Sequence, residues 1–217
     1  MLNSLDGVPV RRLAAMGLPG GRVALRHALA GVGLGAGAVL LTVAVIASGG
    51  DLKIEAKPDQ HAALGFGIEV FVVLSTAAMA EEVAFRGYPF HRLIEVTGPG
   101  GAIAVFSAVF GLVHLKNPNA TTIGFLNTIL IGVVFAIAYL RARTLWLPWG
   151  MHWAWNALLG ALFGLPVSGF DVSVGFRSRA SGPSWLTGGA YGPEASLACT
   201  FAVAVVLAVV LIAFRGR

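Results

Sequence analysis

Long apolar runs separated by short polar stretches dominate the sequence. Each run is long enough, or nearly long enough, to cross a hydrocarbon core that requires about 20 helical residues. We therefore predict an all-α fold, a polytopic transmembrane helix bundle of about six spans. The runs cover approximately residues 23–47, 62–82, 101–115, 122–140, 144–165 and 195–214.

The first run is longer than the core of a signal peptide and lacks a clear cleavage site before the polar stretch 51–60. We interpret it as a retained span. Glycines four residues apart let helix backbones approach closely, so this span is expected to pack tightly against a neighbour. It contains two GxxxG pairs, Gly31/Gly35 and Gly33/Gly37.

The longest connection is the 28-residue stretch 166–193, which is rich in Gly, Ser and Pro. We expect a loop there, on the outer side of the membrane, that caps the bundle. With alternating spans, ten basic residues fall on one side and five on the other, which predicts that both termini are cytoplasmic. The ten are Arg11, Arg12, Arg22, Arg26, Arg86, Arg92, Arg141, Arg143, Arg215 and Arg217, and the five are Lys53, Lys57, Lys116, Arg177 and Arg179.

Composition supports a membrane protein, since the chain is 57% hydrophobic and only 12% charged, whereas a soluble domain is about 25% charged. A length of 217 residues favours one membrane domain over residues 1–217. The net charge of +5 comes from arginines at the ends of apolar runs, which topology explains without nucleic acid. The single cysteine, Cys199, excludes an intrachain disulfide and a CxxC metal site.

The stretch MAEEVAFRGYPF, residues 79–90, places two acids at the end of an apolar run. On a helix Glu82 and Arg86 share a face, while Glu81 is rotated by about 100° from Glu82. Arg86 can therefore neutralise Glu82 and leave Glu81 free to act as a general base on water. An interfacial ion pair at a helix end explains these residues equally well.

Other polar groups interrupt the apolar runs. His114 ends FGLVH, and in HWAWN His152 and Asn156 are four residues apart and share a helix face. Singly, a packed histidine and an aromatic belt account for them. Glu194 follows Pro193, and the first turn of a helix explains that pair without any function.

Taken together, these residues suit a buried catalytic pocket, because ionisable groups within spans by default face a cavity or one another. A carboxylate with imidazoles can deprotonate water, while Asn or His can stabilise an oxyanion. Hydrolysis of an acyl bond is the reaction class favoured. GxSxG and HExxH are absent from the sequence, but Glu81, His114 and His152 have suitable atoms for a divalent metal such as zinc, so the cofactor stays open.

The ordered set EExxxR, FxxxH and HxxxN closely resembles the CPBP family, and the match covers about residues 70–160, the expected catalytic core. These intramembrane proteases are named for CAAX-processing and bacteriocin-processing enzymes and include Abi-type immunity proteins and the type II CAAX endopeptidase. The resemblance implies a helical membrane bundle with a water-filled cavity. It further implies roles for the motif residues: Glu81 as the base, Glu82 and Arg86 as its support, and His114, His152 and Asn156 on the water and oxyanion.

The resemblance also leaves points open. The family is often called a metalloprotease, although a metal-free glutamate mechanism has been argued. Its eukaryotic endopeptidase resembles an eight-helix bundle, more than the six spans expected here. We expect an integral protein of a prokaryotic cell membrane that cleaves a membrane-associated peptide or protein. The resemblance does not imply activity on prenylated CAAX tails, because bacteria generally lack such substrates; if the protein is bacterial, its substrate is something else.

Two other hypotheses use the same residues. One is a non-catalytic bacteriocin-immunity or membrane-partner protein on the same scaffold. The other is proton-coupled transport, which requires ionisable groups spaced along a path, whereas these cluster at one level.

The expected topology contains a conflict of depth. If the second span runs inward and ends near residue 82, Glu81 lies near one membrane face and His114 near the other, given about 1.5 Å of rise per residue. The two could not meet. We therefore expect the helix to continue to about residue 94, and residues 115–121 to form a loop that dips into the cavity.

Overall fold

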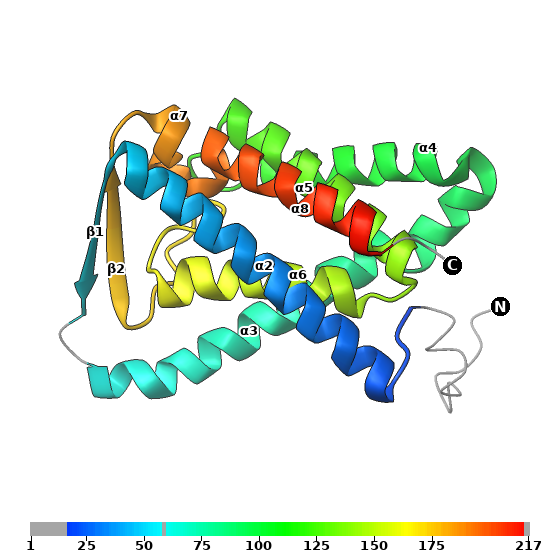
Figure 1. Cartoon of the computed structure of the whole chain (residues 1–217), viewed down its shortest axis with the longest axis horizontal. Helices are drawn as coiled ribbons and strands as arrows, with labels where there is room; N and C mark the ends of the chain where they lie inside the picture. Colours follow the sequence, from blue (N-terminus) through cyan, green and yellow to red (C-terminus); the bar gives the residue numbers. More distant parts are fainter. Residues whose placement is uncertain (1–16, 58–59, 215–217) are drawn as a thin grey trace.

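A computed structural model describes residues 17–57 and 60–214. This part of the chain is mainly helical, in agreement with the predicted class (Figure 1). Its main helices are α2 (Gly21–Gly49), α3 (Gln60–Arg86), α4 (Tyr88–His114), α5 (Thr122–Ala142), α6 (Trp146–Asn156) and α8 (Leu197–Ala213). Shorter elements are the strands β1 (Asp51–Ala56) and β2 (Phe176–Ser181), the helix α7 (Ser184–Thr187), the π-helix η1 (Ala157–Leu162) and the 3-10 helices η2 (Gly189–Tyr191) and η3 (Pro193–Ala195).

Three helical stretches of the described chain are long and apolar enough to cross a membrane: 21–49, 65–114, which includes most of α3 and all of α4, and 122–142. Helix α8 is apolar but shorter. The chain is thus an integral membrane protein, while six spans remain a prediction. Both chain ends lie outside the described residues, and so do four arginines of the orientation argument: Arg11, Arg12, Arg215 and Arg217.

A two-stranded antiparallel sheet joins two connections that are distant in sequence. Strand β1 pairs with β2 in a register that runs from Asp51 opposite Ser181 to Ala56 opposite Phe176. The expectation that 166–193 is only a loop was therefore wrong, because it contains β2, α7 and η2. We call this the sheet end of the bundle (Figure 1).

The depth conflict is resolved by a reversal inside α4. Helix α3 ends at Arg86, so a single helix to residue 94 was wrong, but α4 begins at Tyr88 and continues the helical path. At Gly98 the backbone has φ 74 and ψ 171, and the helix kinks there.

The chain segments before and after this kink, which we call its two limbs, lie side by side. The rings of Phe90 and Phe106, eight residues before and after Gly98, have centroids 5.6 Å apart. Glu81 lies 17 residues before Gly98 and His114 lies 16 after it, a path of about 24 Å in each limb at 1.5 Å per residue. The two side chains therefore reach a similar depth in the bundle.

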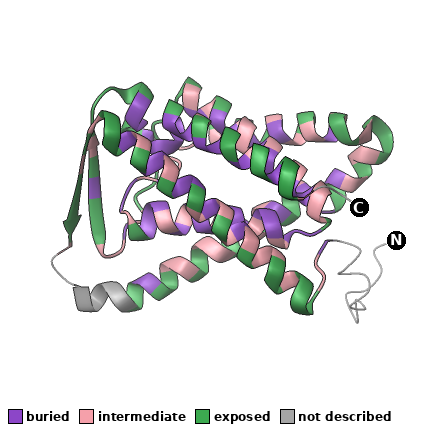
Figure 2. Ribbon diagram, in the orientation of Figure 1, coloured by how far each residue is buried: buried purple, intermediate pink, exposed green. Residues whose placement is uncertain are grey.

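The main apolar cluster of the bundle joins α2, α5, α6 and α8, and these helices carry most of its buried residues; Figure 2 shows buried positions along them. Glycines of α2 allow its close approach to α6: a Cβ atom at Gly31 would lie 2.2 Å from the carbonyl oxygen of Leu147, and one at Gly35 would lie 2.4 Å from that of Met151. No atom lies within 4 Å of the corresponding positions at Gly33 and Gly37. Only the first GxxxG pair is therefore at this interface.

The outer face of α3 exposes large apolar side chains. Ile68, Val72 and Val73 are each about 60% exposed, at 63%, 59% and 64%. Such a surface is unfavourable in water but matches lipid acyl chains. This side of α3 is therefore consistent with contact with the bilayer.

Candidate active site

The predicted pairing of Glu82 with Arg86 is present on α3. Arg86 Nη1 donates to Glu82 Oε1 at 3.2 Å, and both side chains are completely buried. Arg86 Nη2 donates to the carbonyl oxygen of Gly132 on α5 at 3.2 Å. A buried charge is tolerated only when it is paired and hydrogen-bonded, so this pair ties the acidic end of α3 to α5.

Aromatic rings complete the surroundings of the guanidinium. Its central carbon lies 4.7 Å from the ring centre of Phe110, 5.4 Å from that of Phe135 and 5.6 Å from that of Phe85. Ring faces attract cations, and the attraction is stronger away from water. Three elements therefore hold Arg86, and through it Glu82, in one position.

His152 of α6 is oriented by the same carboxylate. Its Nδ1 donates to Glu82 Oε1 at 3.0 Å, and its ring stacks on Phe135 with centroids 5.2 Å apart. With Nδ1 engaged, Nε2 faces the second acid, 3.9 Å from Glu81 Oε2. Glu82 therefore acts as the orienting partner of a histidine, as second acids commonly do in catalytic sites.

Glu81 differs from Glu82 in its partners. Its side chain is 37% exposed, and its Oε2 is buried with no hydrogen-bond partner among the described residues. An oxygen of a carboxylate that is near an imidazole but lacks a donor is available to a water molecule. The two acids are thus inequivalent, as the sequence pattern predicted.

His114 and Asn156 face the same space from two other helices. His114 Nδ1 lies 2.7 Å from the carbonyl oxygen of Phe110; because a carbonyl can only accept, Nδ1 carries the proton and the Nε2 of the neutral ring is an acceptor. Asn156 is one turn beyond His152 and is followed directly by the π-helix η1. Short π-helical segments often occur at functional sites.

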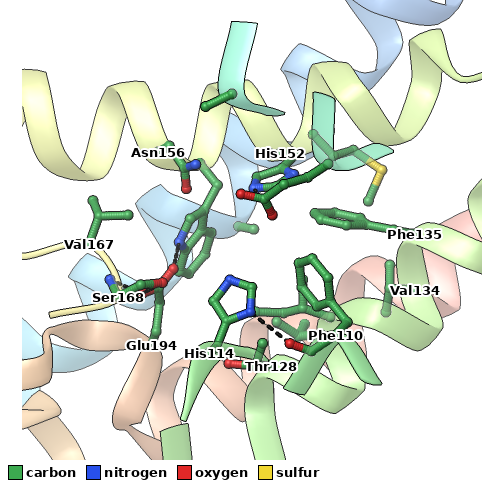
Figure 3. A pocket seen from close by; sticks show the side chains of 18 of the residues that line it. Phe110, His114, Thr128, Val134, Phe135, His152, Asn156, Val167, Ser168 and Glu194 are labelled. Carbon is green, nitrogen blue, oxygen red and sulfur yellow. Dashed lines mark hydrogen bonds and ion pairs between the residues drawn. The ribbon is translucent and has the colours of Figure 1, made fainter. Parts of the chain in front are cut away.

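These groups surround a cavity of about 520 Å³ (Figure 3). Of the six predicted site residues, Glu81, His114, His152 and Asn156 line it. Glu82 and Arg86 lie behind them as buried support and do not line the cavity. Asn117, from the loop expected to dip inward, also lines it. The structure thus brings four predicted residues together from α3, α4 and α6.

A second acid that lines the cavity was missed as a site residue. Glu194 of η3 is 6% exposed and lines the same cavity. Its Oε1 accepts from Trp155 Nε1 at 2.9 Å, and its Oε2 accepts from the hydroxyl and the backbone N–H of Ser168. The predicted helix start is real, as Pro193 and Glu194 open η3, but the turn also aims the carboxylate inward, which sequence alone does not reveal.

Burial is the largest influence on Glu194, and it raises the pKa of this carboxyl group. The hydrogen bonds from Ser168 and Trp155 and the nearby His114 act in the opposite direction and lower the pKa. Desolvation disfavours a charge, whereas donors and cations favour it. The three donors therefore offset part of the cost of placing a carboxylate here.

A metal centre would require several ligand side chains directed at one point. Among the described residues, no group of three or more His, Cys, Asp or Glu side chains is placed to hold one ion. His114 Nδ1, His152 Nδ1 and Glu82 Oε1 are already engaged with protein groups. Metal-binding histidines commonly donate their other ring N–H in this way, so Nε2 of His114, Nε2 of His152 and Glu81 are the atoms that would hold a metal. They are not placed as one ligand group in the described structure, and no catalytic step is derived through a metal.

These features define a helical membrane protein with acids and histidines gathered around an internal cavity. Residues 63–158 match the family described as type II CAAX prenyl endopeptidase Rce1-like. All three motifs lie inside this segment, so the resemblance to CAAX proteases is confirmed. No curated protein sequence and no solved structure gave a significant match.

Proposed function

We propose that the protein is an intramembrane endopeptidase that hydrolyses a peptide bond of a membrane-associated substrate with water activated by Glu81. The family that it matches is one of CAAX-type endopeptidases. The observation that carries the proposal is the inequivalence of the two acids: Glu82 is bonded to Arg86 and His152, whereas Glu81 Oε2 is buried without a donor beside His152. A free carboxylate at a cavity wall is suited to general-base chemistry.

In the proposed reaction the water lies between Glu81 and His114. One proton of the water moves to the Glu81 carboxylate. The second proton forms a hydrogen bond to Nε2 of His114, which is an acceptor because Nδ1 donates to the carbonyl oxygen of Phe110. The resulting hydroxide attacks the peptide carbonyl carbon and forms a tetrahedral oxyanion. Glu81 then gives its proton to the leaving nitrogen, and the C–N bond breaks to yield a carboxylic acid and an amine; the acid then transfers its proton to the amine.

The oxyanion is proposed to be stabilised from α6. The side-chain amide of Asn156 and a protonated Nε2 of His152 are the donors on this wall of the cavity. Glu82 stabilises the positive charge on His152 through the bond to Nδ1. Donors held in place before the reaction contribute most to stabilisation of such charge.

The walls around these groups are largely apolar. Leu34 and Ala38 of α2, Leu74 of α3, and Val203 and Val206 of α8 line the cavity. An apolar chamber beside a hydrolytic site suits a substrate with a hydrophobic portion in or near the bilayer. The substrate class is therefore a membrane-associated peptide or protein.

Comparative proteomics of membranes tests this function. Cells producing the wild type, Glu81→Gln and Glu95→Gln are compared for new peptide termini in membrane-associated proteins. Glu95 is an acid on α4 that pairs with Arg92 outside the cavity, so its variant is the matched control. We expect termini that appear with the wild type and Glu95→Gln and are absent with Glu81→Gln; identical peptide sets in all three strains would contradict the proposal.

The non-catalytic immunity or membrane-partner function is not favoured. The family that the chain matches is named for an endopeptidase, and the buried support of His152 by Glu82 and Arg86 has no evident use in a passive scaffold. A partner protein would keep its cellular phenotype in Glu81→Gln, whereas a protease loses it.

A further inference from the structure

We propose that Glu194 is a positioning residue that holds the segment 167–172 over the sheet end of the cavity and fixes it to α6. We call this segment the roof. Val167, Ser168, Phe170 and Val172 of the roof line the cavity. Because the roof forms part of the cavity wall, its position determines the space in which a substrate binds.

The side chain of Glu194 joins the two parts directly. One carboxylate oxygen accepts from Trp155 Nε1 on α6 at 2.9 Å, and the other accepts from Ser168 Oγ at 2.8 Å and from the Ser168 backbone N–H. Hydrogen bonds to a charged group are roughly twice as strong as neutral ones. Three such bonds to two elements form a clamp between the roof and the helix that carries His152 and Asn156.

Glu194 is itself held in place by α5. The side-chain nitrogen of Asn127 donates to the carbonyl oxygens of Glu194 and Ser196 at 2.8 and 2.9 Å. Asn127 is 2% exposed, so these bonds form away from water. The carboxylate therefore projects from a fixed turn, as a positioning residue requires.

A backbone hydrogen bond also ties the roof to η2. The backbone N–H of Gly169 donates to the carbonyl oxygen of Tyr191 at 2.8 Å, and a Cβ atom at Gly169 would lie 2.0 Å from the carbonyl oxygen of Pro118. The roof thus rests closely on the loop after α4, which follows His114. Loss of the Glu194 clamp is expected to loosen the roof without unfolding the bundle, because these backbone contacts persist.

Hydrogen exchange on the purified, full-length protein tests the clamp without any substrate. Glu194→Gln replaces one acceptor by an NH₂ donor, so at least one of its three donors loses its partner. We expect the amides of the roof to exchange about tenfold to hundredfold faster than in the wild type. The control Glu95→Gln is expected to leave them unchanged. Unchanged roof exchange in Glu194→Gln would overturn the proposal.

Milder variants keep the test informative if Glu194→Gln does not fold. Trp155→Phe removes only the indole donor, and Ser168→Ala removes only the hydroxyl donor. Each is expected to speed roof exchange, and the double variant is expected to differ from the sum of the two, because both act through one carboxylate. Additive effects would show that Glu194 does not couple the roof to α6.

A kinetic readout separates positioning from chemistry, and it rests on the proposed function. If Glu194 positions the roof, Glu194→Gln raises KM by about tenfold and changes kcat by less than about threefold. A fall in kcat at constant KM would contradict this role. If the wild type cleaves no peptide but roof exchange responds to Glu194→Gln, the proposed protease function fails while the clamp stands.

Discussion

Replacement of Arg86 by methionine tests the buried charge network on which the site depends. The substitution keeps an unbranched side chain of moderate size but leaves Glu82, which is 0% exposed, with a single donor, His152 Nδ1. Removal of one partner from a buried ion pair typically destabilises a protein by about 3–5 kcal/mol. At about 2–4 °C per kcal/mol for a chain of this size, the melting temperature is expected to fall by about 6–20 °C.

Arg92→Met is the matched control. Arg92 pairs with Glu95 at the surface, where the two side chains are 58% and 55% exposed, and an exposed pair of this kind contributes at most about 1 kcal/mol. Thermal unfolding of both variants is followed by intrinsic fluorescence in the same detergent at one heating rate, because unfolding of membrane proteins is often irreversible.

A double variant identifies the cause of the loss. In Glu82→Gln/Arg86→Met the buried charge is absent, so the double variant is expected to melt higher than Arg86→Met alone. If Arg86→Met lowers the melting temperature no more than Arg92→Met does, or if the double variant shows the sum of the two single losses, the network is not what holds α3 in place.

Three further predictions address packing, chemistry and pH. Gly35→Ala forces a Cβ atom against an α6 carbonyl and is expected to destabilise by about 1–3 kcal/mol, while Gly37→Ala is tolerated; equal melting temperatures would contradict this packing. Asn156→Ala is expected to lower kcat by about 10²–10³ with little change in KM, as checked by steady-state kinetics. The Ser173 hydroxyl lowers the pKa of Asp171. The Asp171 carboxylate therefore stabilises the fold at pH values above its pKa in the unfolded chain, and this contribution is lost as the pH falls through its lower pKa in the folded protein. Between pH 7 and pH 3 the wild type is therefore expected to lose more stability than Asp171→Asn, and parallel melting curves would exclude this.

Sequence predicted those features of the site that depend on short-range spacing. The i,i+4 spacing predicted that Arg86 pairs with Glu82. The same spacing predicted that His152 and Asn156 share a helix face, and both relations follow from helix geometry alone. Close packing of the first span against a neighbour was likewise expected from GxxxG, but the spacing could not identify α6 as that neighbour or distinguish Gly35 from Gly37, because the face that meets a neighbour depends on the bundle.

Features that depend on contacts distant in sequence were missed. Strands β1 and β2 are six residues each and lie about 120 residues apart, so neither has a partner until the bundle forms. The depth of Glu81 required the reversal at Gly98, whose left-handed backbone was not anticipated. Glu194 was recognised as a helix-start residue, yet the direction of its side chain is set by Trp155 and Ser168 on other elements.

The rate of peptide cleavage by Glu81→Gln in reconstituted vesicles tests the proposed chemistry most directly. A substrate found in the membrane comparison is supplied in the same bilayer, and Glu95→Gln is measured alongside. Loss of the general base is expected to lower kcat by about 10²–10⁴, with a melting temperature close to that of the wild type, while Glu95→Gln retains full activity. Cleavage by Glu81→Gln within about tenfold of the wild-type rate would contradict the assignment of Glu81 as the base.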